Sequence, residues 1–263
     1  MKNKTKMSKS EKLCLILAAL SVVFLLTALI PSKTREAENS PVTEQISSAE
    51  TKARELAALV SGYGGIDNDW ALWLINAKNP LPYGYLPELS TIGVLDLDNR
   101  VAEYALLMVM AARKDRIILS PVSAYRSVER QAENFENTFK NEIFLGRSPE
   151  DAFEYTISRI AVPYTSEHNA GLAIDFNMVE DEFDQTDEFL WLSKNAHKFG
   201  FIMRYPKEST HITGIVYEPW HYRFVGLYHA ERIYNLGITL EEYIGISADD
   251  NSVVEAYRNQ LVV

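Results

Sequence analysis

Two short segments place His, Asp and Glu side chains at close spacings. Residues 166–175 read Ser-Glu-His-Asn-Ala-Gly-Leu-Ala-Ile-Asp, and residues 218–221 read Glu-Pro-Trp-His. They contain three candidate metal ligands, His168, Asp175 and His221. A catalytic zinc uses three such ligands and keeps a fourth position for water, and a His and Asp donor set suits zinc best. The two segments are therefore expected to meet at one point of the fold.

Glu218 lies three residues before His221, so a candidate base and a ligand share one local segment, whether that segment is a turn or a twisted strand. Such a carboxylate can take the proton of an attacking water and pass it to the leaving amine. The alternative is a fourth ligand, which would close the site and make it structural. Gly171 and Ala173 predict a sharp turn or a close backbone approach between the first two ligands.

The pattern S-x-H-x-x-G-x-A-x-D followed by E-P-W-H resembles the zinc D-alanyl-D-alanine carboxypeptidases of the VanY type. The wider group includes the VanX dipeptidases, phage endolysin peptidases and the hedgehog signalling domain. Segments 73–76 with 79–82, 123–127 and 212–214 match the family in the same order. The resemblance covers about residues 69 to 245 and implies a small antiparallel sheet flanked by helices.

The resemblance also implies roles for individual residues. Zn²⁺ would bind His168, Asp175 and His221, with Glu218 as the catalytic base. Arg126 matches the arginine of the family's S-x-Y-R-S segment, and a guanidinium can hold a terminal carboxylate with two parallel hydrogen bonds. Further candidates for substrate binding are Ser166, Ser123 and Gln131.

The implied substrate is the D-alanyl-D-alanine end of peptidoglycan stem pentapeptides or of a lipid-linked precursor. Removal of the last D-alanine would serve wall remodelling or glycopeptide resistance. Three alternatives stay open: an L,D-carboxypeptidase acting on tetrapeptides, which would share every motif; a peptidoglycan endopeptidase, which would not need Arg126 as a carboxylate clamp; and a non-catalytic zinc domain, which the intact Glu218 disfavours.

The amino terminus predicts a membrane anchor. Five lysines within residues 1–12 precede an uncharged apolar segment at 13–30, which is long enough to span a bilayer core. A basic flank favours the cytoplasmic side. We therefore expect a single-pass protein of the cell membrane whose catalytic domain is extracellular. A cleaved signal peptide is the alternative, but its apolar region is usually shorter and ends at a small-residue site.

The predicted organisation is a cytoplasmic segment at 1–12, the anchor at 13–30, a stalk with a short helix at 31–68, the zinc carboxypeptidase domain at 69–245 and a tail at 246–263. The domain contains no disulfide, since Cys14 is the only cysteine. The net charge is −10, and residues 1–12 contribute +4, so the remainder carries −14. That acidity argues against nucleic acid as a partner.

The fold class predicted for the domain is α+β. Helices are expected at 99–114, at 127–143 with Ser127 as N-cap, at 148–160 with Pro149 at the first helical position, and at 187–198. Strands are expected at 116–123, 172–177, 200–205, 214–217 and 220–225. Short strands late in the chain favour an antiparallel sheet over a parallel one.

Overall fold

The structure, a computed structural model, describes residues 69–245. Its first elements are the 3₁₀ helix η1 (Asp69–Leu72), β1 (Leu89–Ile92), β2 (Leu95–Asp98), α3 (Ala102–Lys114), β3 (Pro121–Ser123), α4 (Val128–Phe144) and α5 (Pro149–Ile157). There follow η2 (Glu167–Ala170), β4 (Ala173–Phe176), η3 (Asp181–Gln185), α6 (Asp187–Asn195) and η4 (Ala196–Phe199). The last are β5 (Phe201–Tyr205), α7 (Thr210–Thr213), β6 (Glu218–Phe224), α8 (Leu227–Leu236) and α9 (Leu240–Ile244).

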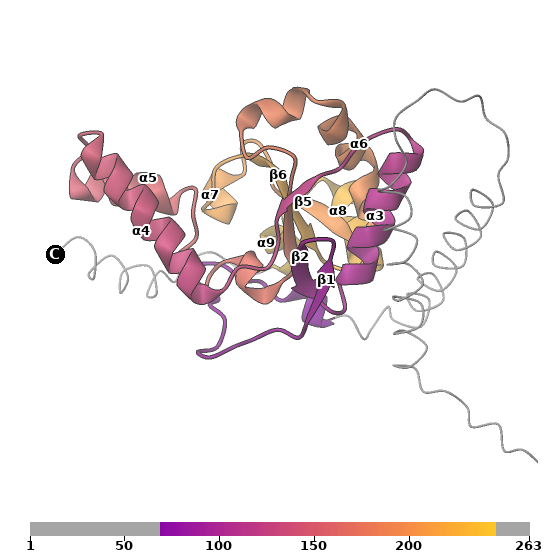
Figure 1. Ribbon diagram of the computed structural model, residues 1–263, viewed down its shortest axis with the longest axis horizontal. Coiled ribbons are helices and arrows are strands. Elements are labelled where there is room, and N and C mark those ends of the chain that lie inside the picture. The colour runs from indigo at the N-terminus through magenta and orange to yellow at the C-terminus, as the bar shows by residue number, and fades with distance from the viewer. Residues whose placement is uncertain (1–68, 246–263) are drawn as a thin grey trace, which may run out of the picture. The chain divides into compact units, whose positions relative to one another are not determined.

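An antiparallel sheet in the order β3–β4–β6–β5 forms the centre of the described region, and β1 and β2 pair as a separate hairpin. Figure 1 shows β5 and β6 between α3, α6 and α8 on one side and the α4–α5 hairpin on the other. The predicted α+β class, with a small antiparallel sheet flanked by helices, is confirmed.

Two apolar clusters fix the helices around this sheet. The first joins β5 to α8 and α9 through Leu74, Ile202, Val225, Ala230, Ile233 and Leu240. The second fills the α4–α5 hairpin with Phe135, Phe139, Ala152, Phe153 and Val162. Truncating a buried phenylalanine to alanine costs about 3–5 kcal/mol, so the phenylalanines of the second cluster contribute strongly to the stability of the α4–α5 hairpin.

The helix starts predicted from the sequence are confirmed at α4 and α5. The Ser127 hydroxyl accepts the backbone N–H of Arg130 at 3.2 Å, and the Ser148 hydroxyl accepts that of Asp151 at 3.1 Å. Pro149 occupies the first turn of α5, where its missing N–H has no intrahelical partner to lose. The α4 cap also fixes the end of the segment that carries Arg126.

Other expectations need correction. The predicted strand at 214–217 is wrong: Gly214, at a φ of +77°, ends α7, and Val216 donates its backbone N–H to Ser158 O outside the sheet. The strand expected at 116–123 is limited to Pro121–Ser123. The helix expected to run to residue 198 changes to a 3₁₀ turn at Ala196. The β1–β2 hairpin was not predicted.

The predicted cytoplasmic segment, anchor, stalk and tail lie outside the described residues. Between residues 69 and 245, the structure contains no helix that is both long enough and apolar enough to cross a membrane.

Candidate metal centre

The sheet register brings two of the predicted ligands together. Asp175 on β4 pairs directly with His221 on β6, and Ser123 on β3 pairs with Asp175 from the other side. Side chains directly opposite each other in an antiparallel sheet share a face. These three side chains therefore form one row across three strands, although His221 is far from Asp175 in the sequence.

A bulge in β6 places Glu218 beside His221. Met203 on β5 pairs with Tyr222 on β6, and Tyr205 pairs with Glu218. From the first pair to the second the chain advances two residues on β5 but four on β6, so the extra residues lie in β6. Residues three apart would point to opposite faces of a regular strand. With the bulge, Glu218 Oε2 lies 3.7 Å from His221 Nδ1. Pro219 lies within the irregular part, where a missing N–H costs no ladder hydrogen bond.

His168 comes from η2, which is held at both ends. The Ser166 hydroxyl accepts the backbone N–H of His168 at 3.3 Å, and Gly171 ends the turn at a φ of +67°. The ring Nδ1 of His168 lies 2.7 Å from the carbonyl oxygen of Ala124. A carbonyl only accepts, so this nitrogen carries the proton and Nε2 is left to face Asp175 Oδ2 at 3.2 Å.

The three candidate ligand atoms lie within 4.8 Å of one another, and all three residues are buried. Asp175 Oδ1 is buried without a hydrogen-bond partner in the described structure, although His221 Nδ1 lies 3.1 Å from it. A buried carboxylate oxygen that lacks a donor is what a cation would satisfy. Burial would raise the pKa of Asp175, but His168 and His221 hold it well below its usual range. The residues therefore fit zinc, with an imidazole–carboxylate–imidazole donor set.

The other titratable groups respond to the same burial. Burial, reinforced by the charge of Asp175, raises the pKa of Glu218 to about 8 against the opposing effect of His221 and Arg126. Burial lowers the pKa of His168. Burial also disfavours charge on His221, but the neighbouring carboxylates of Asp175 and Glu167 outweigh it and raise its pKa to about 9.

A cavity of about 220 Å³ opens beside the three ligands. Its walls include Arg126, Gln131, Asn134, Arg159, Ile160, Ala161, Ser166, His168, Asp175, Val179, Tyr205, Ile215, Glu218, Trp220 and His221. The Arg126 side chain is 20% exposed, and its Nη2 lies 4.0 Å from Asp175 Oδ2. The positively charged guanidinium of Arg126 therefore lies beside the candidate metal position, where it can contact a negatively charged group of a substrate.

Two of the remaining predicted substrate residues, Ser123 and Gln131, hydrogen-bond to Arg126. Arg126 Nη1 donates to Gln131 Oε1 at 3.0 Å, and Nη2 donates to Ser123 Oγ at 2.9 Å. Gln131 in turn donates to the carbonyl oxygen of Ala161 at 2.6 Å. In this arrangement Ser123 and Gln131 orient the guanidinium. Ser166 lines the cavity while it caps η2.

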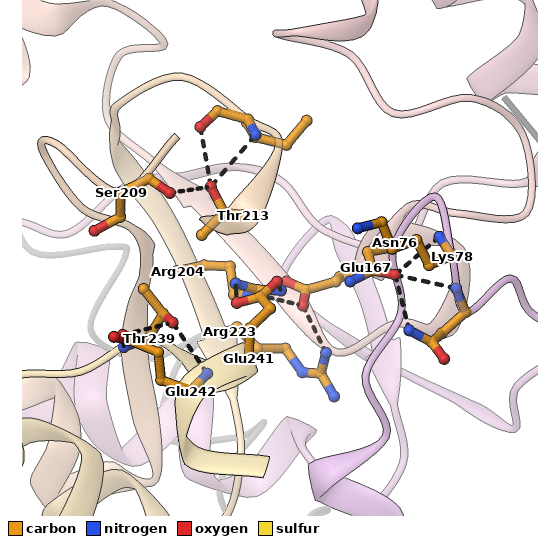
Figure 2. A network of polar contacts seen from close by, with 12 residues as sticks. Asn76, Lys78, Glu167, Arg204, Ser209, Thr213, Arg223, Thr239, Glu241 and Glu242 are labelled. Atoms are coloured by element: carbon orange, nitrogen blue, oxygen red, sulfur yellow. Dashed lines mark hydrogen bonds and ion pairs between the residues drawn. The ribbon is translucent and has the colours of Figure 1, made fainter. Parts of the chain in front are cut away.

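Four charged residues that pack behind His221 were not among the predicted site residues. Figure 2 shows Glu167, Arg204, Arg223 and Glu241 in one network of hydrogen bonds and ion pairs. The available signal was an arginine flanked by apolar or aromatic residues in β5 and again in β6. A buried arginine requires a buried carboxylate, but the sequence does not say which one.

Three buried candidate ligands, a carboxylate beside them and an arginine in the same cavity are the side chains that a metallohydrolase of the carboxypeptidase kind requires. A family profile described as "VanY: D-alanyl-D-alanine carboxypeptidase" matches residues 94–227. A D-alanyl-D-alanine carboxypeptidase of Enterococcus faecalis is 38% identical over 181 residues, which cover 68% of this chain and 68% of that protein.

Two solved structures are also similar. A vancomycin resistance D,D-pentapeptidase VanY mutant in complex with Zn(II) is 39% identical, covers 66% of this chain and 99% of that one, and superposes with a TM-score of 0.61. The LD-carboxypeptidase LdcB is 34% identical, covers 70% of this chain and 89% of that one, with a TM-score of 0.59. The chain belongs to the VanY family of D-alanyl-D-alanine carboxypeptidases.

Proposed function

We propose that this protein is a zinc-dependent D,D-carboxypeptidase that removes the terminal D-alanine from peptidoglycan stem pentapeptides. One observation carries the proposal: Glu218 lies beside a set of three candidate ligands, and Arg126 lies 4.0 Å from Asp175 in the same cavity. The proposed substrate is supported by a relative named as a D-alanyl-D-alanine carboxypeptidase, and the proposed metal by a related structure in complex with Zn(II).

His168, Asp175 and His221 would hold the zinc, which supplies Lewis-acid chemistry and an activated water when bound. Glu218 takes the proton of the water and then transfers it to the departing amine of the last D-alanine. Glu218 lies 3.7 Å from His221 Nδ1, but it is not among the three residues whose ligand atoms all lie within 4.8 Å of one another.

Arg126 selects the end of the peptide. The guanidinium has five N–H donors, and its bonds to Ser123 and Gln131 use two of them. The remaining donors can hold the free carboxylate of the substrate in a fixed position, so that only the last peptide bond reaches the ligands.

The test is the mass of the product after incubation of the zinc-loaded full-length protein with a stem pentapeptide and a matched tetrapeptide. We expect loss of one D-alanine from the pentapeptide only, and no loss with Glu218→Ala. Glu150→Ala, which removes an exposed carboxylate on α5, is the matched control and should cleave normally. Uncut pentapeptide would refute the proposal.

The second candidate is an L,D-carboxypeptidase, which the likeness to LdcB favours. Both activities need the same ligands, base and carboxylate clamp, so the two differ only in the walls of the cavity. Cleavage confined to the tetrapeptide would establish this alternative. Cleavage of neither peptide, with activity on cross-linked peptidoglycan, would indicate an endopeptidase.

We also propose that residues 13–30 anchor the protein in the cell membrane with the catalytic domain outside. The support is the sequence alone: an uncharged apolar segment behind five lysines. A protease added to intact protoplasts should digest the catalytic domain, and an alkaline wash should leave the protein in the membrane fraction. Recovery of the domain from the cytosolic fraction would overturn this topology.

A further inference from the structure

Four charged side chains are buried directly behind the candidate metal centre. The side chains of Glu167, Arg204 and Arg223 have no exposed surface, and that of Glu241 is 3% exposed. Arg204 joins the two carboxylates: its Nε donates to Glu167 at 2.7 Å, and its terminal nitrogens donate to both oxygens of Glu241. Two guanidinium groups face two carboxylates, so the cluster is balanced in charge.

The hydrogen bonds assign the two oxygens of Glu167 different partners. Oε1 accepts from Arg204 Nε and from Arg223 Nη1, both at 2.7 Å. Oε2 lies 3.2 Å from Nε2 of His221. The two arginines keep Glu167 ionised, and an ionised carboxylate only accepts hydrogen bonds. The Nε2 atom of His221 must therefore carry a proton.

We infer that Glu167 is a positioning residue that holds His221 with Nε2–H directed at its own carboxylate and Nδ1 directed at the metal. The inference rests on the zinc site of the proposed function. Nδ1 is the nitrogen that lies 3.1 Å from Asp175 Oδ1 and 3.7 Å from Glu218 Oε2. A carboxylate in this position fixes the ring orientation of a ligating histidine and makes it a stronger donor.

The two histidines then present opposite nitrogens to the metal for one physical reason. Each uses its other nitrogen to donate to a fixed acceptor: His168 Nδ1 to the Ala124 carbonyl, and His221 Nε2 to Glu167. The Ala124 carbonyl belongs to the backbone, whereas Glu167 is a side chain that depends on Arg204 and Arg223 for its position. The ring of His221 is therefore the one that a single substitution can release.

The first test compares two isosteric substitutions in the full-length protein. Glu167→Gln and Glu241→Gln each remove one buried carboxylate that pairs with Arg204, but only Glu167 contacts His221. Zinc affinity is measured by competition with a chelator, alongside a thermal melt. Glu167→Gln should weaken zinc binding by about 10–100-fold, as loss of a ligand's hydrogen-bond partner typically does. Glu241→Gln should leave zinc affinity close to that of the unsubstituted protein, because Glu241 does not contact His221. Equal zinc affinities in the two variants would overturn the inference.

The second test does not depend on any variant folding. Selective ¹⁵N labelling of histidine gives signals from five residues, and long-range ¹H–¹⁵N spectra identify which ring nitrogen binds the metal. With zinc bound, His221 should show a metallated Nδ1 and a protonated Nε2, and Glu167→Gln should shift that Nε2–H signal. A metallated Nε2 would refute the inference. Neither readout uses peptide cleavage, so an uncut pentapeptide would refute the proposed function and leave this result in place.

Discussion

Gly171 lies at the turn that joins His168 to Asp175, and its replacement by alanine is expected to be costly. The residue has a φ of +67°, and a methyl group there would lie 2.6 Å from the backbone nitrogen of Asp98. That nitrogen donates to Gly171 O at 3.0 Å, so the two backbones are already in contact. The neighbour is backbone and cannot rotate away as a long side chain could.

Two terms give the magnitude. A non-glycine residue in the left-handed region costs about 1–2 kcal/mol. Relieving the overlap with Asp98 by moving the backbone costs a further amount of about 1–3 kcal/mol. We expect Gly171→Ala to lower the free energy of unfolding by about 2–5 kcal/mol and to displace His168 or Asp175.

Gly93 provides a matched control for this substitution. It lies in the β1–β2 turn with a φ of +64°, and a methyl group there would meet no atom within 4 Å. Gly93→Ala should therefore show the conformational term alone, about 1–2 kcal/mol. Urea denaturation of the zinc-loaded proteins measures both losses. Equal losses would show that the contact with Asp98 carries no energy and would refute the reasoning.

Three further predictions follow from the site and its surroundings. Arg126→Lys keeps the positive charge but loses the two parallel N–H donors of the guanidinium, so kcat/KM for the pentapeptide should fall about 10–100-fold. A C-terminally amidated pentapeptide has no terminal carboxylate and is already a poor substrate, so its kcat/KM should change little. Removing zinc with a chelator should abolish cleavage, and free zinc restored to 100 times its dissociation constant should raise the free energy of unfolding by about 2.7 kcal/mol. Burial raises the pKa of Glu103, whose Oε1 has no hydrogen-bond partner among residues 69–245, so its ionisation opposes folding at neutral pH. Glu103→Gln should therefore stabilise the protein at pH 7 by less than about 1 kcal/mol. In urea titrations this difference in the free energy of unfolding should shrink as the pH falls, because the carboxyl group of Glu103 becomes protonated.

The candidate site could be predicted because its residues lie in two short segments. Within such a segment, spacing alone limits how far apart the side chains can be, so the sequence predicts that Glu218 and His221 are neighbours whatever the form of the segment. The sequence did not reveal the bulge that makes them so, because a strand bulge is defined by its pairing with Met203 and Tyr205 on β5. The roles of the three candidate ligands and of Arg126 stay predictions, which the zinc-binding and peptide-cleavage assays test.

The β1–β2 hairpin is the clearest element that the sequence does not predict. Each of its strands has four residues, and β2 alternates leucine with aspartate. Four residues are the shortest run in which alternation indicates a strand, so the pattern in β2 is weak. The hairpin nevertheless supports the site, because the backbone of Asp98 on β2 contacts the glycine between two of the ligands.

The buried charges behind His221 were not predictable for a different reason. Glu167 and Glu241 are each separated by 37 residues from Arg204, and nothing in the sequence links the three positions. An arginine within an apolar strand indicates only that some carboxylate must lie opposite it, since an unpaired buried charge is very costly. Glu167 is conspicuous in the sequence because it directly precedes His168. That position alone does not show whether the glutamate side chain lies on the surface or is buried behind the candidate metal centre. Only the fold shows that η2 presents His168 and Glu167 to the same metal centre from two directions, one as a ligand and the other through the ring of His221.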